Sequence, residues 1–233
     1  MKDFKEVSIL VPHRNGEFYR DRNWKYLKNI YNCLIPDAEI CLGDTSSIPY
    51  SKSEAVNNAF KKATREILVI MDSDILIDIE SLNTAISIVD KYKFILPYNK
   101  LVRLDEKSTE KILNKELLNI EDIDISNNSI IKEESRMVGG IYVTTKEVYK
   151  NIGGFDERFR GWGGEDDAVL SCVKYIYGKY HRLDNILYHL YHTRQHQNAE
   201  CRIKNLEILK NDYFNKNNIE NTIKNLKFKN FSN

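Results

Sequence analysis

The sequence predicts an α/β fold in which helices cover both faces of a largely parallel sheet. Patterns typical of strand, helix, strand, helix and strand follow one another within residues 7–71. The strand runs are continuously apolar, as in strands that are buried on both faces. A chain of 233 residues suits one domain with a small appendage. We therefore expect a single domain over residues 1–200 and a polar, basic helical tail over residues 201–233.

The elements of the first half follow from their patterns. The expected strands are short apolar runs, at Val7–Val11, Glu39–Leu42, Ile67–Met71 and Phe94–Pro97. The expected helices have apolar residues at helical spacing, over residues 24–34, 54–63 and 82–89. Pro36 ends the first helix, and Ser53 is expected to cap the second. The carboxyl ends of parallel strands meet at one edge of a sheet, where such folds bind their ligands.

The second half of the chain is less regular. Residues 100–135 are polar and charge-dense, so we expect a surface insertion or mobile loop with a short helix around residues 112–118. The elements expected after it are a strand at Met137–Val143, a helix at Lys146–Ile152, a helix at Glu165–Tyr177 and a β-prone segment at Ile186–His192.

Composition excludes several classes of protein. With 35 Lys and Arg against 34 Asp and Glu, the net charge is +1, too little to hold nucleic acid through its phosphates. No apolar run approaches the roughly 20 residues of a membrane span, and the charged N-terminus does not resemble a signal peptide. Four scattered cysteines without a Cys-x-x-Cys pair indicate reduced thiols. Together these features predict a cytoplasmic protein.

Two carboxylates, Asp72 and Asp74, follow the expected strand at Ile67–Met71. Residues two apart on an extended chain point to the same side. Two like charges at a strand end are costly unless a cation relieves them, and Mn²⁺ or Mg²⁺ is a natural partner for carboxylate oxygens. The alternative is an ordinary solvated turn, because Asp-x-Asp is a common tripeptide.

A second acidic cluster follows the glycine-rich turn Gly161-Trp162-Gly163-Gly164. The glycines permit positive φ angles or a close backbone approach, and the tryptophan offers a flat face to a sugar or a base. Glu165, Asp166 and Asp167 then open a helix. Interaction with the helix dipole would explain one or two acids in this first turn. It explains neither the tryptophan nor three consecutive carboxylates that repel one another.

Two histidines, His189 and His192, lie at the end of the last apolar segment. A single histidine there would be an ordinary structural residue, but two of them near one another suit a metal site. On a regular strand these two residues face opposite sides, so both can bind one metal ion only if the chain bends there. We therefore expect His192 to be a metal ligand, with His189 as a second candidate.

Polar residues also follow the first two expected strands. Pro12, His13 and Arg14 come directly after the first strand, and Asp44 follows the second. Lys52 lies near the start of the next helix. These side chains are placed to contact a nucleotide at the sheet edge. Turn chemistry and a solvated helix face are the alternative explanations.

In this order the elements resemble those of GT-A fold glycosyltransferases, over residues 7–200. The sequence is similar in particular to the β-1,4-galactosyltransferase group and to bacterial family 2 enzymes that share its C-terminal region. The most specific string is Trp162-Gly163-Gly164-Glu165-Asp166-Asp167, which matches that group's Trp-Gly-Gly-Glu-Asp-Asp signature. Four shorter motifs also resemble the family: Pro12-His13-Arg14-Asn15, Asp72-Ser73-Asp74, Gly139-Gly140 and His192-Thr193-Arg194.

The resemblance implies a Rossmann-like nucleotide-binding sheet, with a nucleotide half over about 1–98 and an acceptor half over about 99–200. Asp166 takes the position of the catalytic base. The residues expected to bind the sugars are Trp162, Gly163, Gly164, Glu165, Asp167 and Gly140. Those expected to bind the nucleotide are Pro12, His13, Arg14, Asp44, Lys52, Asp72 and Ser73. The expected metal ligands are Asp74, His192 and His189.

The implied activity is a metal-dependent, inverting transfer of a hexose from a UDP-sugar to a hydroxyl of a glycan or glycoconjugate. Galactose or N-acetylgalactosamine is the favoured sugar, and Mn²⁺ is favoured over Mg²⁺. The alternatives are a glycoside hydrolase, a sugar-nucleotide pyrophosphorylase and a non-catalytic carbohydrate-binding relative. The basic tail, with seven Lys or Arg residues and three acids from residue 201 on, is expected at most to attract the chain weakly to an anionic membrane surface.

Overall fold

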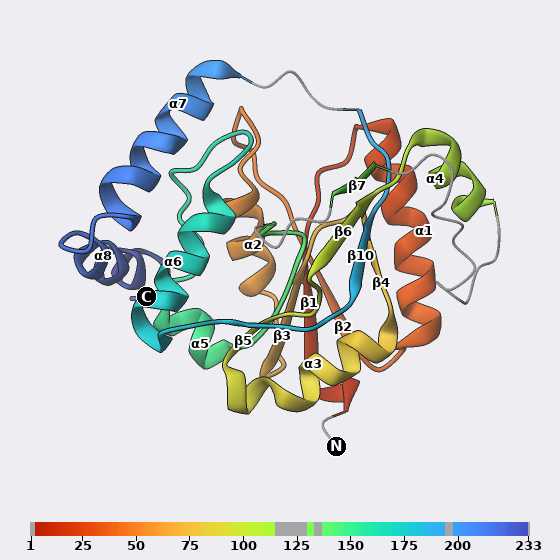
Figure 1. Cartoon of the computed structure of the whole chain (residues 1–233), viewed down its shortest axis with the longest axis horizontal. Coiled ribbons are helices and arrows are strands. Elements are labelled where there is room, and N and C mark those ends of the chain that lie inside the picture. Colours follow the sequence, from red (N-terminus) through yellow and green to blue (C-terminus); the bar gives the residue numbers. More distant parts are fainter. Residues whose placement is uncertain (1–2, 115–129, 133–136, 194–197, 233) are drawn as a thin grey trace.

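A six-stranded sheet runs through the centre of the computed structural model, which describes residues 3–114, 130–132, 137–193 and 198–232 (Figure 1). In spatial order its strands are β2 (Glu39–Gly43), β1 (Val7–Pro12), β3 (Ile67–Met71), β8 (Ile141–Thr145), β5 (Phe94–Leu96) and β9 (His181–Arg182). Strands β2, β1 and β3 are parallel, whereas β8 is antiparallel to both β3 and β5. The predicted α/β architecture is confirmed, with one antiparallel strand at its centre.

Helices flank this sheet on both sides, and in Figure 1 α1 and α2 lie on opposite sides of it. The α-helices are α1 (Phe18–Leu34), α2 (Lys52–Phe60), α3 (Ile79–Tyr92), α4 (Glu106–Leu113), α5 (Lys146–Asn151), α6 (Glu165–Tyr177), α7 (Ala199–Ile208) and α8 (Ile219–Phe231). A short 3-10 turn, Phe4–Glu6, precedes β1, and a π-helical turn, Leu209–Tyr213, follows α7. Among the described residues, no helix combines the length and the apolar character needed to cross a bilayer.

The cap of α2 differs from the prediction. Ser53 is not the N-cap; Ser51 is, because its hydroxyl accepts a hydrogen bond from the Glu54 amide at 3.2 Å. Ser53 instead lies one residue inside the helix, where it is buried. The apolar face that Ala55, Val56 and Ala59 form was nevertheless predicted correctly, and all three are buried.

A second sheet occupies part of the segment that we expected to be a surface insertion. Its strands, in order, are β4 (Ile75–Ile77), β10 (Ile186–His189), β6 (Lys100–Arg103) and β7 (Ile130–Lys132). The surface prediction is wrong for the apolar residues of 100–113, because Leu101, Val102 and Ile112 are buried in the core. The helix found there, α4, begins six residues earlier than expected. Residues 115–118 of the expected helix lie outside the described residues.

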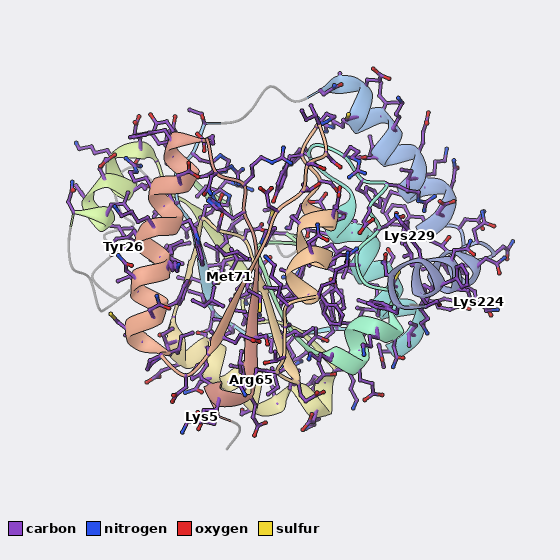
Figure 2. All side chains as sticks on the ribbon, turned by 180° about the vertical axis from the view of Figure 1, so that it is seen from behind. Lys5, Tyr26, Arg65, Met71, Lys224 and Lys229 are labelled. Atoms are coloured by element: carbon purple, nitrogen blue, oxygen red, sulfur yellow. The ribbon has the colours of Figure 1, made fainter. Side chains whose placement is uncertain are left out.

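The parallel strands place their carboxyl ends at one edge of the large sheet. In Figure 2, Lys5 and Arg65, which lie next to the amino ends of β1 and β3, are found together at one end of the molecule, with Met71 near its centre. The register aligns Pro12 at the end of β1 with Gly43 at the end of β2. The segments that follow β1, β2 and β3 therefore emerge side by side.

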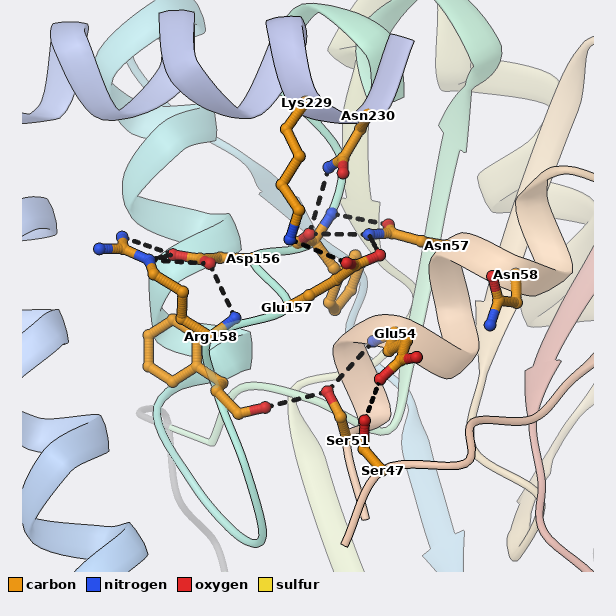
Figure 3. Close-up of polar contacts among 12 residues, drawn as sticks. Ser47, Ser51, Glu54, Asn57, Asn58, Asp156, Glu157, Arg158, Lys229 and Asn230 are labelled. Carbon is orange, nitrogen blue, oxygen red and sulfur yellow. Dashed lines mark hydrogen bonds and ion pairs between the residues drawn. The ribbon is translucent and has the colours of Figure 1, made fainter. Parts of the chain in front are cut away.

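The loop before α6 is fastened to α2 by buried polar side chains (Figure 3). Asn57 accepts a hydrogen bond from the amide of Phe155 at 3.0 Å and donates one to its carbonyl at 2.9 Å. The hydroxyl of Ser51 donates to the carbonyl of Phe159 at 2.9 Å. These bonds satisfy backbone groups that burial would otherwise leave unpaired, and they fix the start of the acidic helix α6 relative to α2.

The last helix, α8, packs on the domain. Its side chains Ile223 and Leu226 are buried, and Asn230 donates a hydrogen bond to the carbonyl of Gly153 at 2.8 Å. A Cβ atom at Gly153 would lie 2.6 Å from that of Leu226, so the glycine permits the close approach of α8. The tail is helical as predicted, while the boundary near residue 200 stays a prediction.

We predict that Gly43→Ala destabilises the fold by overpacking the end of β2 against α2. An added Cβ at Gly43 would lie 1.8 Å from the backbone oxygen of Ala55 in α2, which cannot move without shifting the helix. Urea unfolding should show a loss of about 2–3 kcal/mol or more, as for overpacked cores. The control is Gly178→Ala, where φ is +77° and no atom lies within 4 Å of the added Cβ. It should cost about 1 kcal/mol, and equal losses in the two variants would contradict the close-packing explanation.

Candidate active site

A buried carboxylate and two imidazoles form a cluster at the carboxyl end of β3. Asp74 is only 1% exposed, and Nε2 of His192 lies 3.4 Å from its Oδ2. Nε2 of His189 lies 3.7 Å from its Oδ1. One potential ligand atom from each residue falls within 4.8 Å of the other two. Because the three side chains converge on a small volume, they could hold a single metal ion.

The hydrogen bonds of the imidazoles orient their other nitrogens toward Asp74. Nδ1 of His189 contacts the carbonyl of Leu190 at 2.9 Å, and Nδ1 of His192 contacts that of Thr193 at 2.9 Å. A carbonyl only accepts, so each Nδ1 carries a proton, and in the neutral form of the ring Nε2 is then the nitrogen with the lone pair. Metal-binding histidines commonly have this arrangement. The donor set therefore fits Mn²⁺, which accepts both carboxylate and imidazole ligands.

His189 joins the cluster because the chain leaves the strand at this residue. Strand β10 ends at His189, and the amide of Leu190 then donates to the carbonyl of Asp74 at 2.9 Å. Buried Asn23 of α1 donates to the carbonyl of Tyr191 at 2.9 Å and holds the departing segment. The condition that we set for a shared ion, a bend between the two histidines, is met.

The expected nucleotide-binding residues of the first two strands also meet at this edge. Nε of Arg14 donates to Oδ1 of Asp44 at 3.1 Å, and the guanidinium of Arg14 lies 5.1 Å from the centre of the Tyr50 ring. His13 follows Pro12 and is buried, with Nδ1 at 3.3 Å from Oγ of Ser73. These contacts link the ends of β1, β2 and β3.

Lys52 connects the two acidic motifs of the sequence. Its ammonium lies 2.9 Å from Oδ1 of Asp72 and 3.0 Å from Oδ1 of Asp166. Burial alone would lower the pKa of Lys52, but Asp166 and Asp72 raise it well above its usual range. Lys52 is therefore a permanent cation in this environment, and it offsets the repulsion between two carboxylates that are 94 positions apart in the chain.

The three acids of α6 have different environments. Glu165 is buried, and burial followed by repulsion from Asp166 raises its pKa to about 8. The pKa of Asp167 is also raised, chiefly by burial. Asp166 has the Lys52 ammonium as its partner. At neutral pH, Glu165 therefore holds a proton, whereas Asp166 is the acid of the three that is paired with a cation.

The glycine pair before β8 lies between the two acidic motifs. The carbonyl of Gly140 accepts a hydrogen bond from the amide of Asp72 at 2.8 Å. A Cβ atom at Gly139 would lie 2.3 Å from Oδ2 of Asp166, and φ is +101° there. The site therefore requires glycine at position 139 both for its backbone conformation and to admit the Asp166 carboxylate.

The Trp162 loop is held by α7, a contact that the sequence did not reveal. Trp162 is 60% exposed, and the guanidinium of Arg202 lies 5.6 Å from the centre of its ring. Buried Asn205 donates to the carbonyls of Arg160 and Gly163, each at 2.9 Å. Gly163 and Gly164 have φ angles of +99° and +96°. From the sequence, Asn205 is only a residue of a polar tail, because its partners Arg160 and Gly163 lie some 40 residues earlier.

Comparison with known proteins identifies relatives of this arrangement. The family model described as "N-terminal domain of galactosyltransferase" matches residues 122–197, a third of the chain that includes both the acidic triplet and the histidine pair. Human β-1,4-galactosyltransferase 6 is 22% identical over 192 residues, which are 73% of this chain and 38% of that protein. The chain thus spans about two fifths of the length of this relative. These matches confirm the resemblance to the galactosyltransferases.

Solved structures confirm the GT-A fold. The catalytic domain of Drosophila β1,4-galactosyltransferase 7 in complex with xylobiose has a TM-score of 0.57 and 16% identity, and the match covers 88% of this chain and 79% of that one. A mutant of the same enzyme, in complex with manganese, UDP-Gal and xylobiose, has a TM-score of 0.50, 16% identity and coverages of 83% and 77%. GalNAc-T7 with UDP, GalNAc and Mn²⁺ has a TM-score of 0.55 and 11% identity, with coverages of 90% and 48%.

We predict that Glu165→Gln flattens part of the pH dependence of stability. In the native state the pKa of Glu165 is about 8, against 4.5 for an ordinary glutamate. Between these values the native state binds a proton that the unfolded state releases, so its stability falls as pH rises. The free energy of unfolding, measured in urea from pH 5 to 8, should therefore fall more steeply for the wild type than for Glu165→Gln. The control Glu220→Gln, at an exposed position of α8, should follow the wild type. A wild-type slope in Glu165→Gln would contradict the buried proton.

Proposed function

We propose that this chain is a metal-dependent glycosyltransferase that transfers a hexose from a UDP-sugar to a sugar hydroxyl. One observation carries the proposal. The cluster of Asp74, His189 and His192 lies at the same sheet edge as the acidic start of α6. Lys52 connects the two, because its ammonium pairs with both Asp72 and Asp166. A site for a cation next to a candidate proton acceptor suits glycosyl transfer from a nucleotide donor, in which the leaving diphosphate gains charge and the acceptor hydroxyl loses a proton.

Asp74, His189 and His192 are the residues that would hold the cation. The chemistry that a bound Mn²⁺ or Mg²⁺ supplies is Lewis-acid stabilisation of the charge on a departing diphosphate. Lys52, close to both motifs, adds a fixed positive charge on the same side of the site. The manganese in the complexes of the Drosophila enzyme and of GalNAc-T7 supports Mn²⁺ as the first choice.

Asp166 is proposed as the base that accepts the proton of the attacking hydroxyl. Glu165 is a poor candidate because its raised pKa leaves it protonated at neutral pH. Asp166 also lies next to the backbone at Gly139, and the ammonium of Lys52 pairs with both Asp166 and Asp72. Asp166 is therefore beside the donor half of the site. Attack from the side opposite the leaving group would invert the anomeric centre.

The proposed roles of the remaining site residues follow their places in the structure. At the ends of β1 and β2, Pro12, His13, Arg14 and Asp44 would contact the nucleotide, together with Ser73. The acceptor would lie against exposed Trp162, with Gly163, Gly164, Glu165, Asp167 and Gly140 around it.

The donor sugar and the cellular location are finer proposals. The galactosyltransferase relatives, with UDP-Gal in one complex and GalNAc in another, favour galactose or N-acetylgalactosamine on a glycan or glycoconjugate acceptor. All four cysteines are free, which is compatible with the cytoplasm. Weak attraction to an anionic membrane through the basic tail also stays a proposal.

Metal removal tests the cation site. With UDP-Gal or UDP-GalNAc as donor, we expect slow UDP release that EDTA abolishes and Mn²⁺ restores, measured without any acceptor. Asp74→Ala should lose this metal-dependent activity, because no other carboxylate contacts both imidazoles among the described residues. Asp37→Ala, an exposed position outside the site, should behave like the wild type. Full activity in EDTA would refute the proposal.

Replacement of the acids tests the base. Asp166→Asn keeps the shape of the side chain but cannot accept a proton, so kcat should fall about 10²-fold or more. UDP affinity, measured by calorimetry, should change little. Asp167→Asn is the neighbouring comparison and should mainly raise the acceptor KM. Near-normal turnover of Asp166→Asn together with an inactive Glu165→Gln would instead identify Glu165 as the base.

A further inference from the structure

The cluster of Asp74, His189 and His192 contains a fourth polar side chain, from helix α1. NH1 of Arg20 donates to Oδ2 of Asp74 at 3.0 Å, and NH2 of Arg20 contacts Nε2 of His192 at 3.2 Å. We propose that Arg20 is a resident counter-ion of the metal site, which pairs with Asp74 and His192 and must leave these atoms when a divalent cation binds. This inference rests on the proposed function, since it concerns the same cation site.

The contacts of Arg20 exclude simultaneous binding of a cation to the same atoms. A guanidinium only donates, so Nε2 of His192 accepts the hydrogen bond from Arg20 with its single lone pair, while Nδ1 donates a hydrogen bond to the carbonyl of Thr193. A metal ion would need the same lone pair. Repulsion between a guanidinium and a divalent cation at one carboxylate adds to this exclusion.

Burial explains why a counter-ion is present. Asp74 is 1% exposed, and a carboxylate so buried is costly without a charged partner. The side chain of Arg20 is 37% exposed, so the arginine can move toward solvent while Asp74 cannot. The contacts of Arg20 engage neither Nε2 of His189 nor Oδ1 of Asp74. These two atoms, 3.7 Å apart, give an incoming cation a first point of attachment.

The structure also offers Arg20 a second partner. Oε2 of Glu17, the N-cap of α1, lies 4.0 Å from Nε of Arg20. Oε1 of Glu17 accepts a hydrogen bond from Thr193, next to His192, at 3.1 Å. A displaced Arg20 would therefore remain paired on its own helix. Exchange between Asp74 and Glu17 needs only a change of side-chain rotamer, because both carboxylates are within reach of one guanidinium.

Competition of this kind lowers the apparent affinity for the cation. The apparent dissociation constant equals the intrinsic one divided by the fraction of molecules in which the site is open. If Arg20 closes the site nine times in ten or more, its removal should tighten Mn²⁺ binding about tenfold or more. The effect should appear without nucleotide and without turnover.

The test is a Mn²⁺ titration of the full chain, followed by the electron paramagnetic resonance signal of free Mn²⁺. Arg20→Met should bind Mn²⁺ about tenfold more tightly than the wild type. Arg20→Lys keeps the charge, but an ammonium cannot bridge two acceptors as a planar guanidinium does. Its Mn²⁺ affinity should therefore lie between those of the wild type and Arg20→Met. The matched control is Arg22→Met on the same helix, since Arg22 pairs with Glu110. Its Mn²⁺ affinity should change less than about twofold, because the contacts of Arg22 are with Glu110 and the rings of Phe18 and Tyr19 and not with the cluster.

Two different failures can be told apart. If the wild type binds Mn²⁺ and Arg20→Met binds it no more tightly, or if Arg22→Met shows the same gain, the competition is refuted while the cation site stands. If none of the variants nor the wild type binds Mn²⁺, the cation site is refuted, and with it both the competition and the proposed metal-dependent function. Circular dichroism of each variant confirms that it is folded before the titration.

Discussion

The site is organised by buried negative charge at the carboxyl end of β3. Asp74 has almost no contact with solvent, and Asp72 lies two residues before it. Each carboxylate is costly in this position without a cation. The surrounding elements provide the compensation: Lys52 comes from α2 and Arg20 from α1. The arrangement of the helices around the sheet edge can be understood from this requirement.

Helix α1 shapes the site through other side chains besides Arg20. Through Asn23 it holds the carbonyl of Tyr191, and Tyr19 packs edge-on against the Tyr191 ring at 5.2 Å. Glu17 binds the hydroxyl of Thr193. These contacts draw the segment after β10 away from a strand path. The same helix therefore helps to place His192 beside Asp74. It also supplies Arg20, whose guanidinium pairs with the Asp74 carboxylate.

The parts of the fold that sequence could predict are those with a strong local signal. Strands β1 and β3 are uninterrupted apolar runs, and α6 begins at the acidic triplet, so each was found close to its observed position. Strand β6 was missed because Leu101 and Val102 form only a short apolar pair between charged residues. Such a pair has no periodicity to detect, and its burial depends on pairing with β10.

The candidate site divides in the same way. Its acidic and histidine motifs are visible as local strings, whereas the partners that complete it are distant in sequence. Lys52 was expected near a nucleotide, but its bridge to Asp166 spans 114 positions. Arg20 and Asn205 lie in ordinary polar stretches of helices, and only the packing of those helices brings them to the site. The place of His189 beside Asp74 likewise depends on the end of β10 at this residue, which the sequence does not mark.

The most direct test of this account is a crystal structure of the protein soaked with Mn²⁺ and UDP, with anomalous diffraction used to locate the manganese. The account predicts one strong peak bound by a carboxylate oxygen of Asp74 and by Nε2 of both His189 and His192, at about 2.0–2.3 Å. The UDP diphosphate should lie between the manganese and the ammonium of Lys52. Manganese bound elsewhere, or a peak that leaves Asp74 paired with Arg20, would contradict it.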